Sequence, residues 1–211
     1  MTETEPTPRI STRRAATRRR LLAAASTVVA ERGVNGASVE SICEEAGFTR
    51  GAFYSNFESK EALLNALMEA KHQVLLDGIR AILDSEPTQD APDVIDDLVG
   101  RVLAAYPLDR ESRLVESEIG LYMIRNPEHA PALLTAMAPF RAELARLVLQ
   151  GLDRAGRRLT VDVEDALNAL ISGYETGTTD LWISSASGRP EDPDVCRRTL
   201  TIIIKAISEP I

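Results

Sequence analysis

The sequence predicts an all-α protein of about nine helices, arranged as a small N-terminal domain followed by a larger helical one. Apolar residues recur at spacings of three and four over most of the 211 residues, as on the buried face of a helix. β-Branched residues nowhere alternate with polar ones for long, so no strand is expected. Segments that contain Gly and Pro divide the helical pattern into pieces.

The first helix is expected to begin near Thr12. The tail before it, residues 1–12, is rich in Pro, Thr and Glu and is expected to be disordered. Gly33 suits the position that ends a helix, because glycine readily adopts a left-handed backbone. The apolar stripe between these limits consists of Leu21, Leu22, Ala25, Val28 and Val29.

A helix, a tight turn and a very short helix follow the first helix. Ser38 is a good N-cap for the segment VESICEEA, and Gly47 ends that helix. The segment TRGAFYSN comes after almost no linker and predicts a helix of one or two turns. Ser59 then caps a long helix that ends near SEPTQDAP. This order of elements predicts a helix-turn-helix domain over residues 13–60.

Residues 61–211 are expected to form a second domain that is also helical. Prolines and glycines separate its apolar-periodic segments, for example at Pro107 and Gly156. The helices expected beyond the long one cover residues 91–105, 109–126, 130–155, 162–187 and 193–208.

Charge is distributed unevenly along the chain, whose net charge is −8. Residues 1–60 carry nine Lys and Arg against seven Asp and Glu, whereas the remainder carries fifteen against twenty-five. This asymmetry indicates a polyanion partner for the N-terminal part only. No apolar run approaches a membrane span, no secretory signal is recognisable, and Cys43 and Cys196 have no metal-like spacing. A cytoplasmic protein with reduced thiols is expected.

The short helix carries the residues expected to meet DNA. Phe53 and Phe57 lie four residues apart and are expected to be buried together with Phe48. Small or polar residues near the start of the helix let its backbone approach the major groove. The candidates for DNA contact in this segment are Thr49, Arg50, Gly51, Ala52, Tyr54, Ser55 and Asn56. Lys60 is a candidate for phosphate binding at the start of the next helix.

The stretch VVAERGVNGASVESICEEAGFTRGAFYSNFESKEALLNALM closely resembles the DNA-binding region of the TetR family of transcriptional regulators. The resemblance implies DNA contacts from Ser38, Thr49, Arg50, Gly51, Tyr54 and Lys60. The family usually has Ala or an aliphatic residue in place of Cys43, so this thiol is expected in the core, with a redox sensor as the alternative. In the segment RRAATRRR, Arg13, Arg14 and Arg18 are candidates for further minor-groove or phosphate contacts, with a solvated tail as the alternative.

The resemblance further implies that the acidic remainder binds a small molecule and forms a homodimer. Gly173 and Gly177 interrupt an apolar helix, where glycine costs about 1 kcal/mol relative to Ala, so a close helix contact is expected there. The candidates for the dimer interface are Leu170, Gly173, Gly177, Leu181 and Ile203, with packing inside one chain as the alternative. The candidates for the ligand pocket are Tyr106, Glu118, Tyr122, Phe140, Tyr174 and Trp182. Glu118 has a second interpretation, as a solvated or Arg-paired carboxylate at the edge of its helix.

The function expected from these patterns is that of a DNA-binding repressor without a cofactor or a metal. A homodimer would occupy a near-palindromic operator and leave it when a small molecule binds. An enzyme is disfavoured because the chain lacks a phosphate loop, a GxSxG elbow and a metal-spaced His and Cys cluster, and has only two His. A regulator that acts by protein contacts alone is the other alternative.

Overall fold

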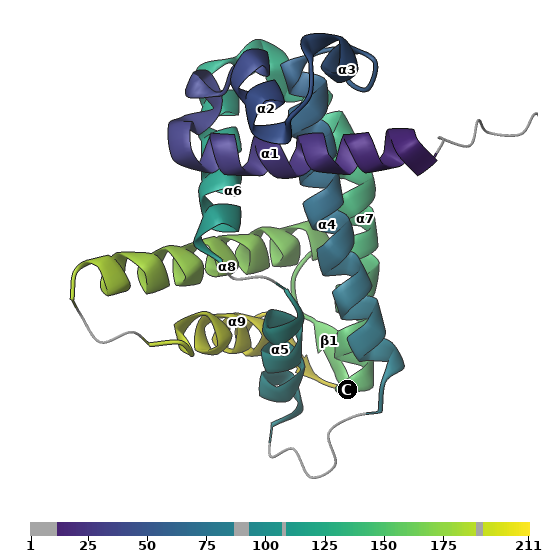
Figure 1. The fold of residues 1–211 in the computed structure, drawn as a ribbon. Coiled ribbons are helices and arrows are strands. Elements are labelled where there is room, and N and C mark those ends of the chain that lie inside the picture. The colour runs from purple at the N-terminus through teal and green to yellow at the C-terminus, as the bar shows by residue number, and fades with distance from the viewer. Residues whose placement is uncertain (1–11, 87–92, 107–108, 189–191) are drawn as a thin grey trace, which may run out of the picture. The chain divides into compact units, whose positions relative to one another are not determined.

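The computed structural model describes residues 12–86, 93–106, 109–188 and 192–211 (Figure 1), so the tail expected to be disordered lies almost wholly outside the described residues. The described ranges contain nine α-helices, one short 3-10 helix and two short strands. The helices are α1 Thr12–Gly36, α2 Val39–Ala46, α3 Arg50–Tyr54, α4 Lys60–Asp84, α5 Val94–Ala105, α6 Arg110–Arg125, η1 Pro127–His129, α7 Ala130–Arg154, α8 Val163–Ala186 and α9 Val195–Ala206. The all-α prediction is confirmed, and the expected helix boundaries differ from these by a few residues.

The chain forms two compact units that do not follow the expected division at residue 60. Unit 1 contains the chain up to Leu67 together with Leu114–Arg125. Unit 2 contains Met68–Arg113 and Asn126–Ile211. Helices α4 and α6 therefore each have residues in both units. No helix of the described residues has the length and the apolar character needed to cross a lipid bilayer.

Local capping fixes the helices of unit 1. Gly33 has φ 69°, which interrupts the helical backbone of α1 at the glycine where the helix was expected to end. Ser38 and Ser41 form a reciprocal capping box at the start of α2, and Gly47 ends α2 in the left-handed conformation. The Ser59 hydroxyl accepts a hydrogen bond from the Ala62 amide at 3.1 Å, which confirms it as the cap of α4.

The core of unit 1 combines helices from both segments of the chain. Its fully buried side chains include Leu21, Val28, Ile42, Phe53, Leu63 and Val115. Cys43 is also buried, at 4% exposure, and burial is the main cause that raises the pKa of its thiol. A buried neutral thiol behaves as a small apolar group, which agrees with the expected core role.

Unit 2 is organised around the packing of α8 against α9, which lie side by side in Figure 1, with α5 against α9. A Cβ atom on Gly177 would lie 2.8 Å from the backbone Cα of Cys196, and one on Gly173 would collide with Ile203. Both glycines are buried against α9 of the same chain. Their assignment to the dimer interface is therefore corrected, because the close helix approach that they permit lies within one chain.

Two short strands depart from the expectation of no strand. Strands β1 Arg157–Leu159 and β2 Ser208–Pro210 pair antiparallel, with Leu159 opposite Ser208. The Arg157 guanidinium donates to the Ser208 carbonyl at 2.6 Å and so reinforces the pairing. Strands of three residues are too short to show an alternating pattern, so this error has a simple physical reason.

A stacked histidine lies among the apolar residues of unit 2. The His72 ring of α4 lies parallel to the Phe140 ring of α7, with 3.8 Å between the ring centroids. Burial lowers the pKa of His72 from its usual 6.5 to about 4. The imidazole is therefore neutral in the folded protein at pH values where an unfolded chain would protonate it.

The substitution Gly177→Ala is expected to destabilise the protein by about 1–3 kcal/mol, because the added methyl group meets backbone atoms of α9 that cannot rotate away. Gly120→Ala in α6 is the matched control, since nothing lies within 4 Å of its Cβ position. There the exchange should stabilise the helix by about 0.5–1 kcal/mol. Urea unfolding curves of the two variants measure both effects. Equal changes in the two midpoints would contradict the packing described for Gly177.

The stability of the protein should fall between pH 7 and pH 5 through His72. In this range the unfolded chain binds a proton at His72 and the folded chain does not, so unfolding becomes more favourable by about 2 kcal/mol at pH 5. Because the folded pKa is the lower one, the loss begins near 6.5 and is complete near 4. Urea unfolding of wild type and His72→Gln at both pH values isolates this contribution. His129→Gln, the same exchange at the other histidine, is the control and should retain the wild-type loss.

Candidate nucleic-acid interface

Helix α3 has only five residues and is fixed from behind by aromatic rings. Phe53 and Phe57 are 0% and 3% exposed, and their ring centroids lie 5.9 Å apart. The Thr49 side chain caps the helix by accepting a hydrogen bond from the Ala52 amide at 3.3 Å. The burial expected for the two phenylalanines is confirmed, and it leaves the opposite face of α3 open.

The open face carries several of the residues expected to contact DNA. Thr49, Arg50, Gly51 and Tyr54 are all exposed. Tyr54 is 49% exposed, and its ring packs edge-on against Phe53. A Cβ atom on Gly51 would meet only the Thr49 hydroxyl, at 3.7 Å. The protein therefore has room for a side chain at residue 51. Because Gly51 has none, a binding partner can approach the backbone of α3 more closely there.

Other predicted contact residues have hydrogen-bonding roles within unit 1. The side chains of Ser55 and Asn56 donate to the Ala52 carbonyl at 2.9 and 2.8 Å and so satisfy the end of α3. Ala52 itself is half-buried. Ser38 is exposed, and its hydroxyl accepts a hydrogen bond from the Ser41 amide. These groups help to shape the motif, and their hydroxyl and amide atoms are not all available to a partner.

Two arginines of α1 hold the backbone that follows α3. Arg14 donates to the Ser55 carbonyl at 3.1 Å, and Arg18 donates to the Asn56 carbonyl at 2.9 Å while its guanidinium lies 4.2 Å from the Phe57 ring centroid. Both arginines therefore position the residues that follow α3, and their contact with DNA stays a prediction. Arg13 is exposed.

Arg20 makes the corresponding contact at the turn before α3, and it was missed from the sequence. It donates to the Ala46 carbonyl at 2.8 Å, and its guanidinium lies 4.6 Å from the centroid of the Phe48 ring. The contact could have been predicted from the arginines of α1 and the aromatic residues on both sides of α3, because guanidinium groups favour aromatic faces.

Lys60 is also bound inside unit 1. Its ammonium donates to the Val34 carbonyl at 3.0 Å and lies 5.7 Å from the ring centroid of Tyr122. The Val34 amide donates in turn to the Glu118 carboxylate at 3.4 Å. Both backbone groups of Val34, one residue after the Gly33 kink, are therefore held by side chains of α4 and α6. To contact a phosphate as well, Lys60 would have to use the N–H donors of its ammonium that do not bind the Val34 carbonyl.

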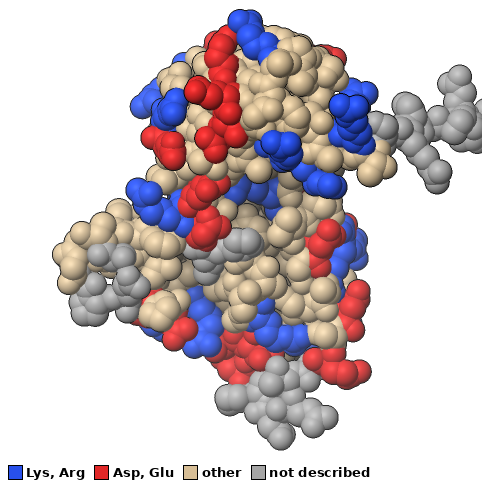
Figure 2. All heavy atoms as spheres, viewed as in Figure 1, with Lys and Arg blue, Asp and Glu red and all other residues tan. Residues whose placement is uncertain are grey.

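The charge around α3 is balanced and not strongly positive. Arg50 pairs with Glu40 of α2 at 2.7 Å, and both side chains are more than half exposed. Exposed pairs of this kind typically stabilise a protein by less than about 1 kcal/mol. Among the described residues on the face drawn in Figure 2, acidic and basic side chains are interspersed. Attraction to phosphate therefore depends on individual side chains and helix ends.

The six residues expected to form a ligand pocket are divided between the two units, and their shared role stays a prediction. Glu118 and Tyr122 belong to unit 1, where the Tyr122 hydroxyl donates to Glu61 at 3.2 Å. Tyr106 and Tyr174 belong to unit 2, with ring centroids 6.0 Å apart. Phe140 stacks on His72, as described above. The buried Nε1 donor of Trp182 has no hydrogen-bond partner within the described part of the chain.

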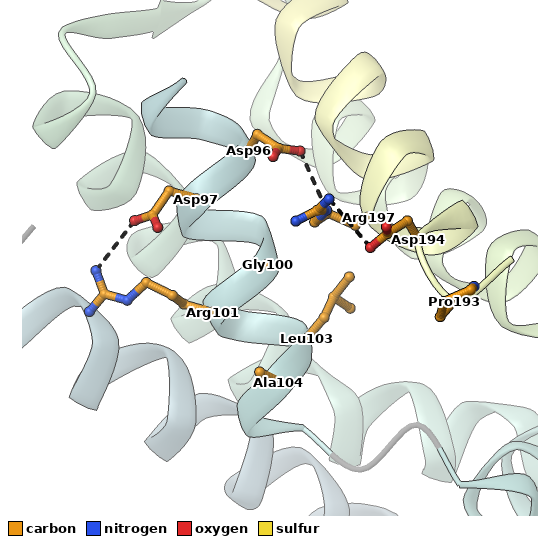
Figure 3. Close-up of a pocket in the computed structure, with 9 residues that line it drawn as sticks. All are labelled: Asp96, Asp97, Gly100, Arg101, Leu103, Ala104, Pro193, Asp194 and Arg197. Atoms are coloured by element: carbon orange, nitrogen blue, oxygen red, sulfur yellow. Dashed lines mark ion pairs between the residues drawn. The ribbon is translucent and has the colours of Figure 1, made fainter. Parts of the chain in front are cut away.

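A pocket of about 420 Å³ in unit 2 lies elsewhere, between α5 and the start of α9. None of the six expected residues lines it. Figure 3 shows Arg197 between Asp96 and Asp194, at 3.7 and 3.3 Å, and Arg101 paired with Asp97. Both arginines of the lining lie beside aspartates, and the lining carries three aspartates against two arginines. No group of three or more His, Cys, Asp or Glu suited to a metal ion is found in the ranges that the structure describes.

Comparisons with known proteins agree with the resemblance. Residues 21–67 match the sequence model of the family described as bacterial regulatory proteins, tetR family. The nicotine-responsive transcriptional repressor HdnoR of Paenarthrobacter nicotinovorans is 27% identical over 73% of this chain and 77% of its own length. The regulator UidR of Escherichia coli K12 is 30% identical, over 56% of this chain and 57% of its own length. Both relatives are named as transcriptional regulators.

Solved structures extend the likeness to nearly the whole chain. Salmonella enterica GusR has a TM-score of 0.68 and 26% identity over 97% of each chain. The fatty acid degradation regulator FadR from Bacillus halodurans has the same TM-score at 20% identity, over 96% of this chain and 97% of its own, which shows the fold alone. Residues 21–67, which include the exposed face of α3, therefore match the TetR family of regulators, and the chain is similar to proteins of this fold over nearly its whole length.

Proposed function

We propose that the protein is a homodimeric repressor whose α3 binds an operator in the major groove and which a small molecule releases. The single observation that carries this proposal is the open face of α3, where Thr49, Arg50 and Gly51 are exposed while Phe53 is fully buried. Apart from the Thr49 cap and the exposed pair of Arg50 with Glu40, this face makes no contact that the fold of unit 1 requires, so its exposed polar groups are available to a partner. A location in the cytoplasm, where bacterial DNA lies, follows from this function.

The residues of the open face suit the chemistry of a DNA groove. An arginine side chain can donate two hydrogen bonds to O6 and N7 of guanine, and a tyrosine hydroxyl can donate to a phosphate. Gly51 lets the helix backbone approach the base edges. We assign Thr49, Arg50, Gly51 and Tyr54 to DNA contact, with unit 1 as the DNA-binding unit.

Dimerisation is proposed through unit 2. Ile183 of α8 and Ile202 of α9 are 60% and 66% exposed, although both lie on helices that pack together in one chain. Burying such side chains against a second copy would remove apolar surface from water. Two copies related by a twofold axis would present two α3 helices to half-sites about 34 Å apart. Leu170, Leu181 and Ile203, which are only partly buried, remain candidates for the same interface.

Helices α4 and α6 offer a route by which an effector in unit 2 acts on unit 1. Both helices have residues in each unit. In unit 1 they hold the two backbone groups of Val34 through Lys60 and Glu118, directly before α2. A displacement of either helix would move the backbone at Val34, which precedes α2, and would so change the position of α3. Effector binding and DNA binding are then coupled reciprocally.

Selection of duplexes from a random DNA pool tests the proposed function. The wild type is expected to enrich a near-palindromic sequence and to bind it in a gel shift. The double variant Arg50→Ala, Tyr54→Ala should lose at least about tenfold in affinity, because each lost base contact typically costs about 1–3 kcal/mol. An unchanged thermal unfolding midpoint controls for folding. Undiminished binding by the double variant would refute the assignment of α3.

Gly51→Ala separates the contribution of α3 to binding from its contribution to the fold. The added methyl group has room in the free protein, so stability should be unchanged or higher by up to about 1 kcal/mol. The same methyl group would stand between α3 and the base edges, and affinity for the selected duplex should fall at least about tenfold, or 1.4 kcal/mol. Fluorescence anisotropy and urea unfolding measure the two quantities. A more stable variant with full affinity would place the DNA against another surface.

A further inference from the structure

An exposed carboxylate meets the guanidinium of the proposed DNA-binding face. Glu40 is the second residue of α2, and Arg50 is the first residue of α3. The Glu40 Oε1 atom lies 2.7 Å from Arg50 Nη1, and the side chains are 58% and 61% exposed. The guanidinium carbon lies 5.9 Å from the centroid of the Tyr54 ring. Arg50 is therefore held between a carboxylate on one element and an aromatic ring on its own helix.

This pair is unexpected at a surface that meets a polyanion. Between Ser38 and Phe57, Arg50 is the only basic residue, whereas Glu40, Glu44 and Glu45 are acidic. A carboxylate beside the single arginine is repelled by phosphate whatever the DNA sequence. The pair also contributes little to the fold, because it is exposed and because α2 is already capped by Ser38 and Gly47. Its effect must therefore be sought in binding.

The geometry of the pair favours base edges over phosphates as partners of Arg50. A guanidinium has five N–H donors, and Glu40 engages the Nη1 group, so the others stay available for O6 and N7 of a guanine. A phosphate contact by Arg50 would bring the Glu40 carboxylate against the DNA backbone or break the pair. In the major groove, by contrast, the carboxylate can accept a hydrogen bond from cytosine N4.

We propose that Glu40 is a specificity-determining residue, which positions Arg50 for guanine and weakens binding to DNA of unrelated sequence. Glu40 acts partly through Arg50 and partly by repelling phosphates. The inference rests on the proposed function, since it assumes that α3 binds DNA.

The test compares two duplexes and the isosteric variant Glu40→Gln. One duplex carries the sequence that the wild type enriches from a random pool, and the other is a shuffled sequence of the same length and composition. Removal of the carboxylate should tighten binding to the shuffled duplex by several-fold. The ratio of the two affinities, measured by fluorescence anisotropy at one fixed salt concentration, should fall on the order of tenfold, the size of one lost base contact.

Glu45→Gln is the matched control, because it removes the same charge from the same helix and leaves the pair between Glu40 and Arg50 in place. It should tighten binding to both duplexes equally and leave the ratio unchanged. In an Arg50→Ala background, Glu40→Gln should change the ratio no more than Glu45→Gln does. Thermal unfolding midpoints verify that all variants fold.

Two results would overturn the inference. One is an equal change of the ratio in Glu40→Gln and Glu45→Gln, which would make the effect one of charge alone. The other is a full effect of Glu40→Gln in the Arg50→Ala background, which would show that Arg50 is not involved. A wild type that enriches no sequence is a different result: it would overturn the proposed function, and this inference together with it.

Discussion

The burial of two phenyl rings behind a helix of five residues is the constraint on which the proposed DNA-binding surface depends. A single helical turn is not stable alone, because nucleation costs more than one hydrogen bond returns. Phe53 and Phe57 supply the missing stabilisation from one side of α3, at 0% and 3% exposure. Arg50 and Gly51 on the other side of α3 are exposed and take no part in the core, so their chemistry can be selected for binding.

The arginines of α1 extend the same constraint to the backbone. Arg18 and Arg20 donate to the Asn56 and Ala46 carbonyls and lie over the Phe57 and Phe48 rings, so each satisfies an acceptor and covers a ring. For Arg18, the positive charge alone indicated a phosphate contact from the sequence, and Arg20 was not predicted to have a role. A guanidinium serves an internal carbonyl and a phosphate equally well, and only the tertiary structure distinguishes the two.

Features that depend on neighbours in sequence were predictable, and features that depend on distant residues were not. The caps at Ser38, Thr49 and Ser59 and the turn at Gly47 are local, and they fixed the boundaries of α2 to α4. The all-helical class followed from apolar periodicity. The pairing of β1 with β2, the packing of Gly177 on α9 and the contact of Glu118 with Val34 join residues far apart in the chain. The pattern of apolar and polar residues along one sequence does not show which distant residues come into contact.

The return of α6 to unit 1 has a consequence for how the protein is made. Val115 and Ile119, which are 0% and 2% exposed, belong to the same compact unit as α1, α2 and α3, yet they follow a segment that belongs to unit 2. Ribosomes deliver a chain from its N-terminus, and domains fold as units once complete. The helices of the proposed DNA-binding face therefore emerge before the buried residues of α6 that complete their unit, and the N-terminal unit is still incomplete when these helices leave the ribosome.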